Sequence, residues 1–145
     1  MRFLIGADED DPLLDVISAE LKKLGHDVTR TGAMPGAPAP WGNVAVEIAG
    51  AVASGAADHG VVACYTGTGV TIAANKVNGV RAALCADAAT AEGARKWNDA
   101  NVLALSLRAT SPAVAREIVN AWIATAYGGS EDASLDAIRR AERGR

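Results

Sequence analysis

Short apolar runs alternate along this chain with segments whose apolar residues recur at helical spacing, and the alternation occurs five times. The apolar runs have the length of strands, and helical patterns separate them. They occupy residues 2–7, 26–30, 59–64, 79–85 and 101–107. This order predicts an α/β fold in three layers, in which a five-stranded parallel sheet is doubly wound, Rossmann-like, with helices on both faces.

The segments between the apolar runs carry the signals that start helices and form loops. Three prolines and three glycines fall within residues 31–43, which predicts a loop. Asn43 stands at the cap position of the helix expected at 43–55. After the last strand and its helix, a charged helix is expected at about 131–143, packed either on its own subunit or on a partner. Residues 1–145 are interpreted as a single domain.

Composition and charge exclude several classes of function. The chain of 145 residues has a net charge of −3, which gives no overall attraction to nucleic acid or to an anionic membrane. No apolar run reaches the roughly 18 residues of a membrane span, and the acidic start MRFLIGADEDD is unlike a signal peptide. Two cysteines and two histidines show no metal-ligand spacing, so no metal is expected. Reduced thiols in the cytoplasm are expected.

The stretch CYTGTGVTIAANK, residues 64–76, combines a cysteine, two glycines and a helix start directly after a predicted strand. In a parallel sheet, ligands bind beyond the carboxyl ends of the strands, so this loop is expected to meet Asp8 there. Backbone amides at 66–70 would point from the helix start toward an oxyanion, and a helix start favours the thiolate form of a nearby cysteine. Such a thiolate suits proton abstraction next to a carbonyl, with Cys64 as the base.

Other interpretations of this stretch are open at this point. TGTGVTIAA partly matches a dinucleotide fingerprint, but it follows the third strand rather than the first, and no Gly-Lys-Ser/Thr of a P-loop follows it. Cys64 alone would more often be a small buried hydrophobic residue, which is the interpretation for Cys85. Trp41, Trp97 and Trp122, taken one by one, more often belong to a core or an interface than to a ligand site.

Three longer patterns are similar to those of one enzyme family. The pattern CxTGxGxxIAANKVxGxRAALC occupies 64–85, NDANVLALSLR occupies 98–108, and the first strand ends in Gly-x-Asp at 6–8. Over roughly residues 1–127, the chain resembles the type B ribose-5-phosphate isomerases and their galactose-6-phosphate isomerase relatives, the RpiB/LacA/LacB family. The resemblance implies a homodimer with the active site at the subunit interface, and pairing of dimers into tetramers stays open. It also implies aldose–ketose interconversion through a cis-enediol, with no metal or organic cofactor.

The resemblance further implies a role for each matching residue. Cys64 moves the proton between C1 and C2, and Thr66 helps to open the sugar ring. Asp8 and Asn98 contact sugar hydroxyls. The enediolate oxygen is stabilised by the backbone amides of Tyr65, Thr66, Gly67, Thr68 and Gly69.

Four positions depart from the pattern of the ribose-phosphate enzymes. Glu9 stands where the family commonly has a histidine, and Trp97 replaces the histidine that is linked to ring opening. Tyr65 replaces a glycine, and SEDAS at 130–134 replaces arginines that clamp the phosphate. Changes at four points around one pocket predict a changed substrate, and Trp97 is expected to narrow the pocket.

A substrate that cannot cyclise needs no ring-opening histidine. The preferred hypothesis is therefore isomerisation of a four-carbon, open-chain sugar phosphate of the erythrulose 4-phosphate type. Its phosphate would bind Arg108, with Arg139 or Arg140 from a partner's terminal helix, because a guanidinium fork suits phosphate. The second hypothesis is a pentose or hexose, phosphorylated or not, with Glu9 or a water in place of the histidine. The third is a sugar-binding homologue without turnover, against which the intact loop argues.

Overall fold

The computed structural model describes residues 1–144, which form five strands and six helices. The strands are β1 (Arg2–Ala7), β2 (Asp27–Gly32), β3 (His59–Cys64), β4 (Ala82–Leu84) and β5 (Val102–Ser106). The helices are α1 (Pro12–Lys23), α2 (Trp41–Ala53), α3 (Thr68–Ala74), α4 (Ala88–Asn98), α5 (Pro112–Ala124) and α6 (Asp132–Arg143). Within this part of the chain, every helix is too short or too polar to cross a membrane.

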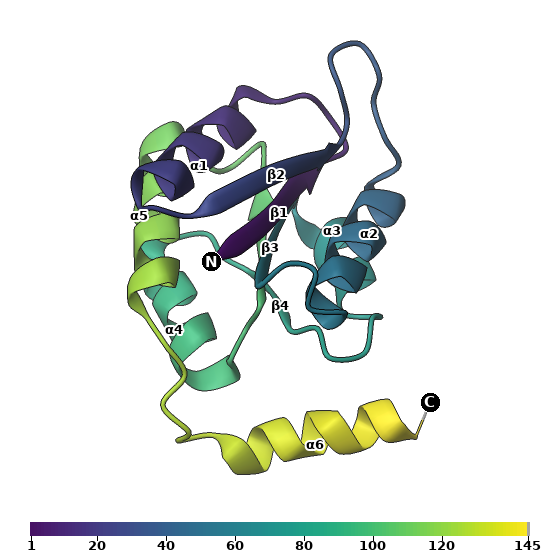
Figure 1. Ribbon diagram of the computed structural model, residues 1–145, viewed down its shortest axis with the longest axis vertical. Helices are drawn as coiled ribbons and strands as arrows, with labels where there is room; N and C mark the ends of the chain where they lie inside the picture. The colour runs from purple at the N-terminus through teal and green to yellow at the C-terminus, as the bar shows by residue number, and fades with distance from the viewer. Residues whose placement is uncertain (145) are drawn as a thin grey trace.

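The strands form one parallel sheet in the order β2-β1-β3-β5-β4. Helices α1, α4 and α5 cover one face of this sheet, and α2 and α3 cover the other, as Figure 1 shows. The central strand β3 is buried at all six positions because both of its faces are covered. Strands buried on both faces have continuous apolar sequences, which is the pattern from which the sheet was predicted. The strand order and the helix after α5 confirm the predicted doubly wound α/β fold with an extra terminal helix.

Small residues let the helices approach the sheet closely. A Cβ atom at Gly60 in β3 would lie 2.6 Å from Cγ2 of Ile48 in α2, closer than packed carbon atoms tolerate. A larger residue at position 60 would therefore push α2 away from the sheet. This approach matters for the site, because α2 begins beside the carboxyl ends of β1 and β3.

The loop between β2 and α2 is fastened to the end of β1. The amide of Ala33 donates to the carbonyl of Ala7 at 2.9 Å, and the amide of Ala39 donates to the carbonyl of Asp8 at 3.0 Å. The cap predicted at Asn43 is wrong: α2 begins at Trp41, directly after Pro40, and no side chain caps it. Because the ring of Pro40 fixes its own φ and the loop is already anchored, the helix starts two residues earlier than expected.

Helix α6 stands apart from the two helical layers, beyond the amino ends of the strands (Figure 1). Leu135 is its one buried residue among those described. Near its end, the carboxylate of Glu142 accepts from the amide of Gly79 at 2.9 Å, and Asn78 donates to the Glu142 carbonyl at 3.4 Å. Of the two packings that the sequence leaves open, these contacts are with the helix's own chain.

A buried histidine at the start of β3 makes stability depend on pH. The His59 ring stacks on Phe3, with centroids 5.4 Å apart, and its Nδ1 accepts from Nε1 of Trp122 at 3.3 Å. Burial, with the positive charge of Arg95 as a smaller cause, lowers the pKa of His59 to about 4. The folded chain therefore keeps His59 neutral at pH values where the unfolded chain protonates it.

We expect the free energy of unfolding to fall as the pH is lowered from about 6.5 toward 4. An unfolded His59 binds its proton near pH 6.5 and the folded one near pH 4, so folding loses up to about 3 kcal/mol across this window, and about 2 kcal/mol of it by pH 5. Urea unfolding at about pH 7 and pH 5 measures the difference. A His59→Gln variant should lose most of this pH dependence; an unchanged slope would contradict the assignment to His59.

Candidate active site

The loops that follow β1 and β3 meet where the strand order reverses. The connection from β1 runs through α1 to β2 on one side, whereas β3 lies on the other side of β1. In open parallel sheets this arrangement leaves a crevice at the carboxyl ends of the two strands. Asp8 follows β1 and Cys64 ends β3, so the fold brings these two predicted residues to the same crevice.

A cavity of about 310 Å³ occupies this crevice. Its volume lies at the lower end of the range for small-molecule sites, ~300–1,000 Å³. Six residues that the sequence singles out line it together, and a seventh, a tryptophan, was missed. The lining residues are Asp8, Trp41, Cys64, Tyr65, Thr66, Thr68 and Gly69.

The position of Cys64 is fixed by its backbone. Its carbonyl accepts from the amide of Leu107 at 2.9 Å and from that of Gly67 at 3.2 Å, so the strand end is tied to the segment after β5 and to its own loop. The side chain is 5% exposed and lines the cavity. Cys85, 1% exposed, belongs to the core on the other face of the sheet, and burial raises the pKa of its thiol to about 12.

Gly67 shapes the loop that follows the cysteine. Its φ of +77° is in the left-handed region, and a Cβ there would lie 2.5 Å from Cδ1 of Leu84 and 2.9 Å from the carbonyl of Leu105. Its own amide is occupied by the carbonyl of Cys64. The amides of Thr68, Gly69 and Val70, at the start of α3, donate to no group of residues 1–144. These amides, together with those of Tyr65 and Thr66, have no acceptor within residues 1–144 and can meet an oxyanion, whereas the amide of Gly67 serves the turn.

Asp8 presents an unsatisfied carboxylate oxygen to this crevice. Its Oδ1 is buried and has no hydrogen-bond partner among the residues that the structure describes. Burial raises the pKa of Asp8, and the backbone amides of Asp8 and Glu9 offset part of this rise. A buried acceptor without a partner is unfavourable, and a ligand hydroxyl can satisfy it.

Arg108 lies at the same edge of the sheet, stacked on Tyr65. The amide of Arg108 donates to the carbonyl of Tyr65 at 3.1 Å, and its guanidinium carbon lies 5.8 Å from the centroid of the Tyr65 ring. Both side chains are exposed. Within residues 1–144, no carboxylate lies within ion-pair distance of Arg108. A guanidinium held in this way is free to bind an anion at the rim of the cavity.

Glu9 and Trp97 are among the predicted residues that do not line this cavity. Glu9 is exposed and lines a neighbouring groove with Asp10 and the loop at 34–38. Trp97 is 52% exposed, and its ring lies against Gly93 of its own helix, where a Cβ would be 2.8 Å away. Because α4 ends at the amino ends of the strands, Trp97 could narrow the pocket beside Cys64 only from a second copy of the chain, and this expectation stays a prediction.

Asn98 shares this opposite edge with Trp97. It ends α4, and β5 begins just after it at Val102, which pairs with Gly60. Cys64 pairs with Ser106 at the carboxyl end of β5. About 13 Å of strand therefore separates the amino ends of the strands, where Asn98 lies, from the carboxyl ends, where Cys64 lies. Asn98 instead lines a larger cavity, of about 440 Å³, between the sheet and α6. One chain thus does not bring Asn98 to Cys64.

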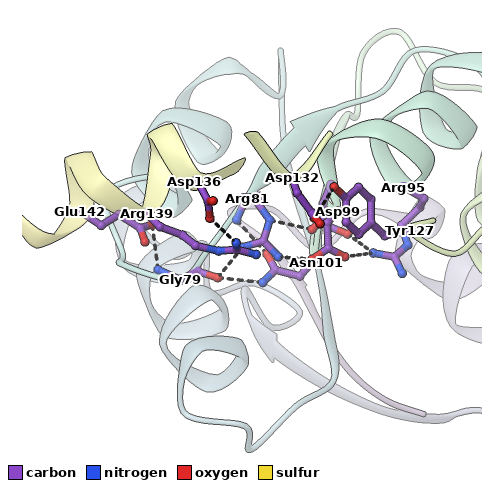
Figure 2. A network of polar contacts seen from close by, with 11 residues as sticks. Gly79, Arg81, Arg95, Asp99, Asn101, Tyr127, Asp132, Asp136, Arg139 and Glu142 are labelled. Carbon is purple, nitrogen blue, oxygen red and sulfur yellow. Dashed lines mark hydrogen bonds and ion pairs between the residues drawn. The ribbon is translucent and has the colours of Figure 1, made fainter. Parts of the chain in front are cut away.

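A polar network, drawn in Figure 2, joins this edge to α6. The Arg81 guanidinium donates to the carbonyl and to the carboxylate of Asp99, both at 2.8 Å. The Arg81 amide donates to Asn101 at 2.8 Å, and Asn101 donates to the carbonyl of Gly79 at 2.9 Å. Glu142 of α6 binds the amide of the same glycine. The segment 79–81 therefore holds both the turn after Asn98 and the terminal helix.

The two arginines predicted in α6 differ in their surroundings. Arg139 pairs with Asp136 at 2.7 Å (Figure 2), and this hydrogen bond raises the pKa of Arg139. Arg140 is exposed and forms no ion pair with residues 1–144. Neither residue lines the cavity beside Cys64 in its own chain. Arg140 is the freer of the two to bind a phosphate.

Trp41 is the cavity residue that sequence reasoning missed. Its ring is 48% exposed and packs on Gly69, where a Cβ would lie 3.1 Å from Cε3 of the indole. The signal that was available is its place at the end of the proline-rich loop that follows β2, which reaches the ligand-binding edge. A single tryptophan carries no periodic pattern, so core and interface positions were the stronger expectation.

Comparison with known proteins covers nearly all of this chain. A family model described as Ribose/Galactose Isomerase matches residues 3–138. A D-erythrulose-4-phosphate isomerase from Pectobacterium atrosepticum is 40% identical over 135 residues, which are 92% of this chain and 89% of that protein. The ribose-5-phosphate isomerase B of Escherichia coli is 37% identical over 130 residues, 89% of this chain and 87% of that one.

A solved structure agrees with these sequence matches. The ribose-5-phosphate isomerase B of Clostridium thermocellum has a TM-score of 0.93 to this chain at 36% identity, with 99% of each chain covered. The family predicted from the patterns at 64–85 and 98–108 is thereby confirmed. The chain belongs to the ribose/galactose isomerase family.

Proposed function

We propose that this protein interconverts the aldose and ketose forms of a sugar phosphate through a cis-enediol, with Cys64 as the base. The observation that carries the proposal is the cavity itself. It places a buried thiol, the start of α3 with its unengaged amides, and the unpartnered Asp8 carboxylate around one space. Family membership supports the reaction class. A thiol base has to stay reduced, and the reducing cytoplasm that we propose as the location of this protein would keep it so.

The proton transfer needs only groups that surround this cavity. Starting from the ketose, the Cys64 thiolate takes a proton from C1, and the electron pair of that C–H bond forms the C1–C2 double bond. The carbonyl oxygen on C2 gains the negative charge, which the amides of Gly69 and Val70 would stabilise. The proton of the C1 hydroxyl passes to this C2 oxygen, so the negative charge moves to the C1 oxygen. The thiol then returns its proton to C2, where the electron pair of the C1–C2 double bond forms the new C–H bond, and the C1 oxygen becomes the aldehyde as the Cys64 thiolate is restored. Asp8 would accept a hydrogen bond from a sugar hydroxyl.

Arg108 is proposed to bind the phosphate of the substrate. It lies on the same edge as Cys64, it has no carboxylate partner in the described chain, and the ring of Tyr65 supports its guanidinium. A cation stacked on an exposed aromatic ring gains about 0.5–1 kcal/mol, which favours one orientation of the guanidinium. Arg139 and Arg140 of a partner's α6 would add to this site.

Removing Arg108 should weaken phosphate binding more than it slows chemistry. We expect Arg108→Ala to raise KM for the sugar phosphate about 10- to 100-fold, because a hydrogen bond to a charged group contributes about 1.5–3 kcal/mol. The change in kcat should be smaller. Steady-state kinetics and inhibition by inorganic phosphate measure this. Arg116→Ala, which removes another exposed arginine from α5, is the control; equal KM values for the two variants would exclude Arg108 from the phosphate site.

We propose a homodimer in which each active site uses residues of both chains. Asn98 and Trp97 lie at the opposite edge from Cys64, so they can contact a sugar bound at Cys64 only in a second copy. The same holds for Arg139 and Arg140 of α6, which lies beyond the amino ends of the strands. The larger cavity beside Asn98 is then the other half of the composite site.

A four-carbon substrate such as erythrulose 4-phosphate is the preferred identity. The cavity is small, Trp41 takes up part of its wall, and an erythrulose-4-phosphate isomerase is 40% identical to this chain. The replacement of the ring-opening histidine by Trp97 supports an open-chain sugar. The alternative is a pentose phosphate, because a ribose-5-phosphate isomerase B has a similar identity of 37%.

A substrate panel followed by proton NMR in D₂O tests the proposal. Aldoses and ketoses of four, five and six carbons, each with and without phosphate, are incubated with wild type and with Cys64→Ala. We expect conversion of a four-carbon sugar phosphate by the wild type only. Faster turnover of ribose 5-phosphate would replace the tetrose by the pentose. No conversion of any sugar, by protein shown to be folded, would contradict the isomerase activity.

A further inference from the structure

The Trp41 indole forms a large apolar wall of the cavity beside the start of α3. Its six-membered ring faces Gly69, with Cε3, Cδ2 and Cζ3 at 3.1–3.3 Å from the place of a Cβ atom. Gly69 contributes one of the amides that are free to meet the enediolate. Trp41 and Cys64 line the same cavity. The carbons that exchange the proton would therefore lie beside the indole.

The fold holds this wall in place. Trp41 is the first residue of α2 and directly follows Pro40, and the loop before it is bonded to Ala7 and Asp8 through two backbone amides. An aromatic ring that stays 48% exposed on an anchored element is poorly explained by core packing. Within residues 1–144, no group accepts a hydrogen bond from the Trp41 indole N–H, so this ring has no polar partner that would account for its position.

We infer that Trp41 shields the Cys64 thiol and the reacting carbons from water, so that the proton taken from C1 returns to C2 instead of exchanging with solvent. The inference rests on the proposed function. A proton on the Cys64 thiol has two fates: delivery to C2 of the enediol, or exchange with water that enters the cavity. Apolar surface over the thiol slows only the second.

Deuterium content of the product, measured per turnover, tests this inference. The ketose that wild type converts is incubated in D₂O, and early product is analysed by proton NMR for deuterium at C2 of the aldose. We expect well under one deuterium per turnover for wild type and for Trp41→Phe. For Trp41→Ala we expect a value approaching one, with a fall in kcat of about tenfold as water enters the site. Val46→Ala, which removes an equally exposed residue of α2 away from the cavity, should match wild type.

Alkylation by iodoacetamide gives a second readout that needs no substrate. The neutral reagent forms a bond between sulfur and its methylene carbon and releases iodide. Peptide mass spectrometry assigns the product to Cys64 or to the buried Cys85. We expect Cys64 in Trp41→Ala to react about tenfold faster than in wild type, Trp41→Phe or Val46→Ala, because access limits thiol chemistry.

The outcomes separate this inference from the proposed function. Full deuterium incorporation by wild type, or equal incorporation and equal alkylation rates in Trp41→Ala, would overturn the shielding by Trp41 and leave the isomerase intact. A folded wild type without turnover of any sugar would overturn the proposed function, and unchanged alkylation in Trp41→Ala would then overturn the shielding as well. Circular dichroism and thermal unfolding establish that each variant is folded.

Discussion

Replacing Cys64 by alanine is expected to lower kcat about 10³-fold, because a positioned general base contributes roughly 10²–10⁴ to such a reaction. Substrate binding should change little, since the amides at the start of α3 and the Asp8 carboxylate remain. KM should therefore stay within a few-fold of wild type. The small amount of solvent deuterium that wild type incorporates should be lost together with isomerisation, because both need removal of the same proton. Kinetics and proton NMR in D₂O measure the two losses.

The second cysteine provides a matched control for this experiment. Cys85→Ala removes a thiol of the same size from the core on the opposite face of the sheet. Its activity should stay within a few-fold of wild type, whereas its melting temperature should fall slightly because a buried side chain becomes smaller. If folded Cys64→Ala kept more than a tenth of the wild-type kcat, another group would have to be the base.

Mixing two inactive variants should restore activity. Cys64→Ala and Asn98→Ala each damage both composite sites of a homodimer, by removing residues from opposite edges of the sheet. In a mixed dimer, one site carries both substitutions and the other carries neither. Random pairing makes half of the dimers mixed, so the recovered activity should be about a quarter of the wild-type value.

Subunit exchange must occur for this recovery to appear. The two variants are unfolded together in urea, refolded, and assayed against each variant refolded alone. A Cys64→Ala/Asn98→Ala double mutant, mixed with wild type, is the control. Each mixed dimer then has one damaged residue in each site, so only the quarter of dimers with two wild-type chains should be active, half of what simple dilution gives. Recovery no greater than the sum of the two separate variants would contradict sites that are shared between chains.

The fold followed from the sequence because parallel strands covered on both faces must be apolar throughout. His59–Cys64 is buried at all six positions, and its sequence HGVVAC shows no polar alternation. The length of each run and the breaks between runs then defined the strand order along the chain. The start of α2 was misplaced because Asn43 is a good capping residue by chemistry, whereas the anchored loop and Pro40 decide the entry of that helix.

Half of the candidate site was also predictable. The order of elements placed Asp8 and Cys64 at the same edge, since each directly follows or ends a strand. Order alone does not encode where a side chain points, and so Glu9 was grouped with Asp8 although it faces another groove. Trp41 could not be ranked above other aromatic residues, because its contact with Gly69 depends on how α2 packs and not on local pattern.

The attachment of two distant parts of the chain to residues 79–81 has an evolutionary consequence. Gly79 binds Glu142 of the terminal helix, while Arg81 and Gly79 hold Asp99 and Asn101 beside Asn98. Substitutions in α6 and in the turn at 98–101 therefore act on a shared partner, and their effects on stability should be non-additive. During evolution, a destabilising substitution in α6 would be accepted more readily together with a compensating substitution in the turn at 98–101. The residues of α6 and those beside Asn98 would therefore change in a correlated way.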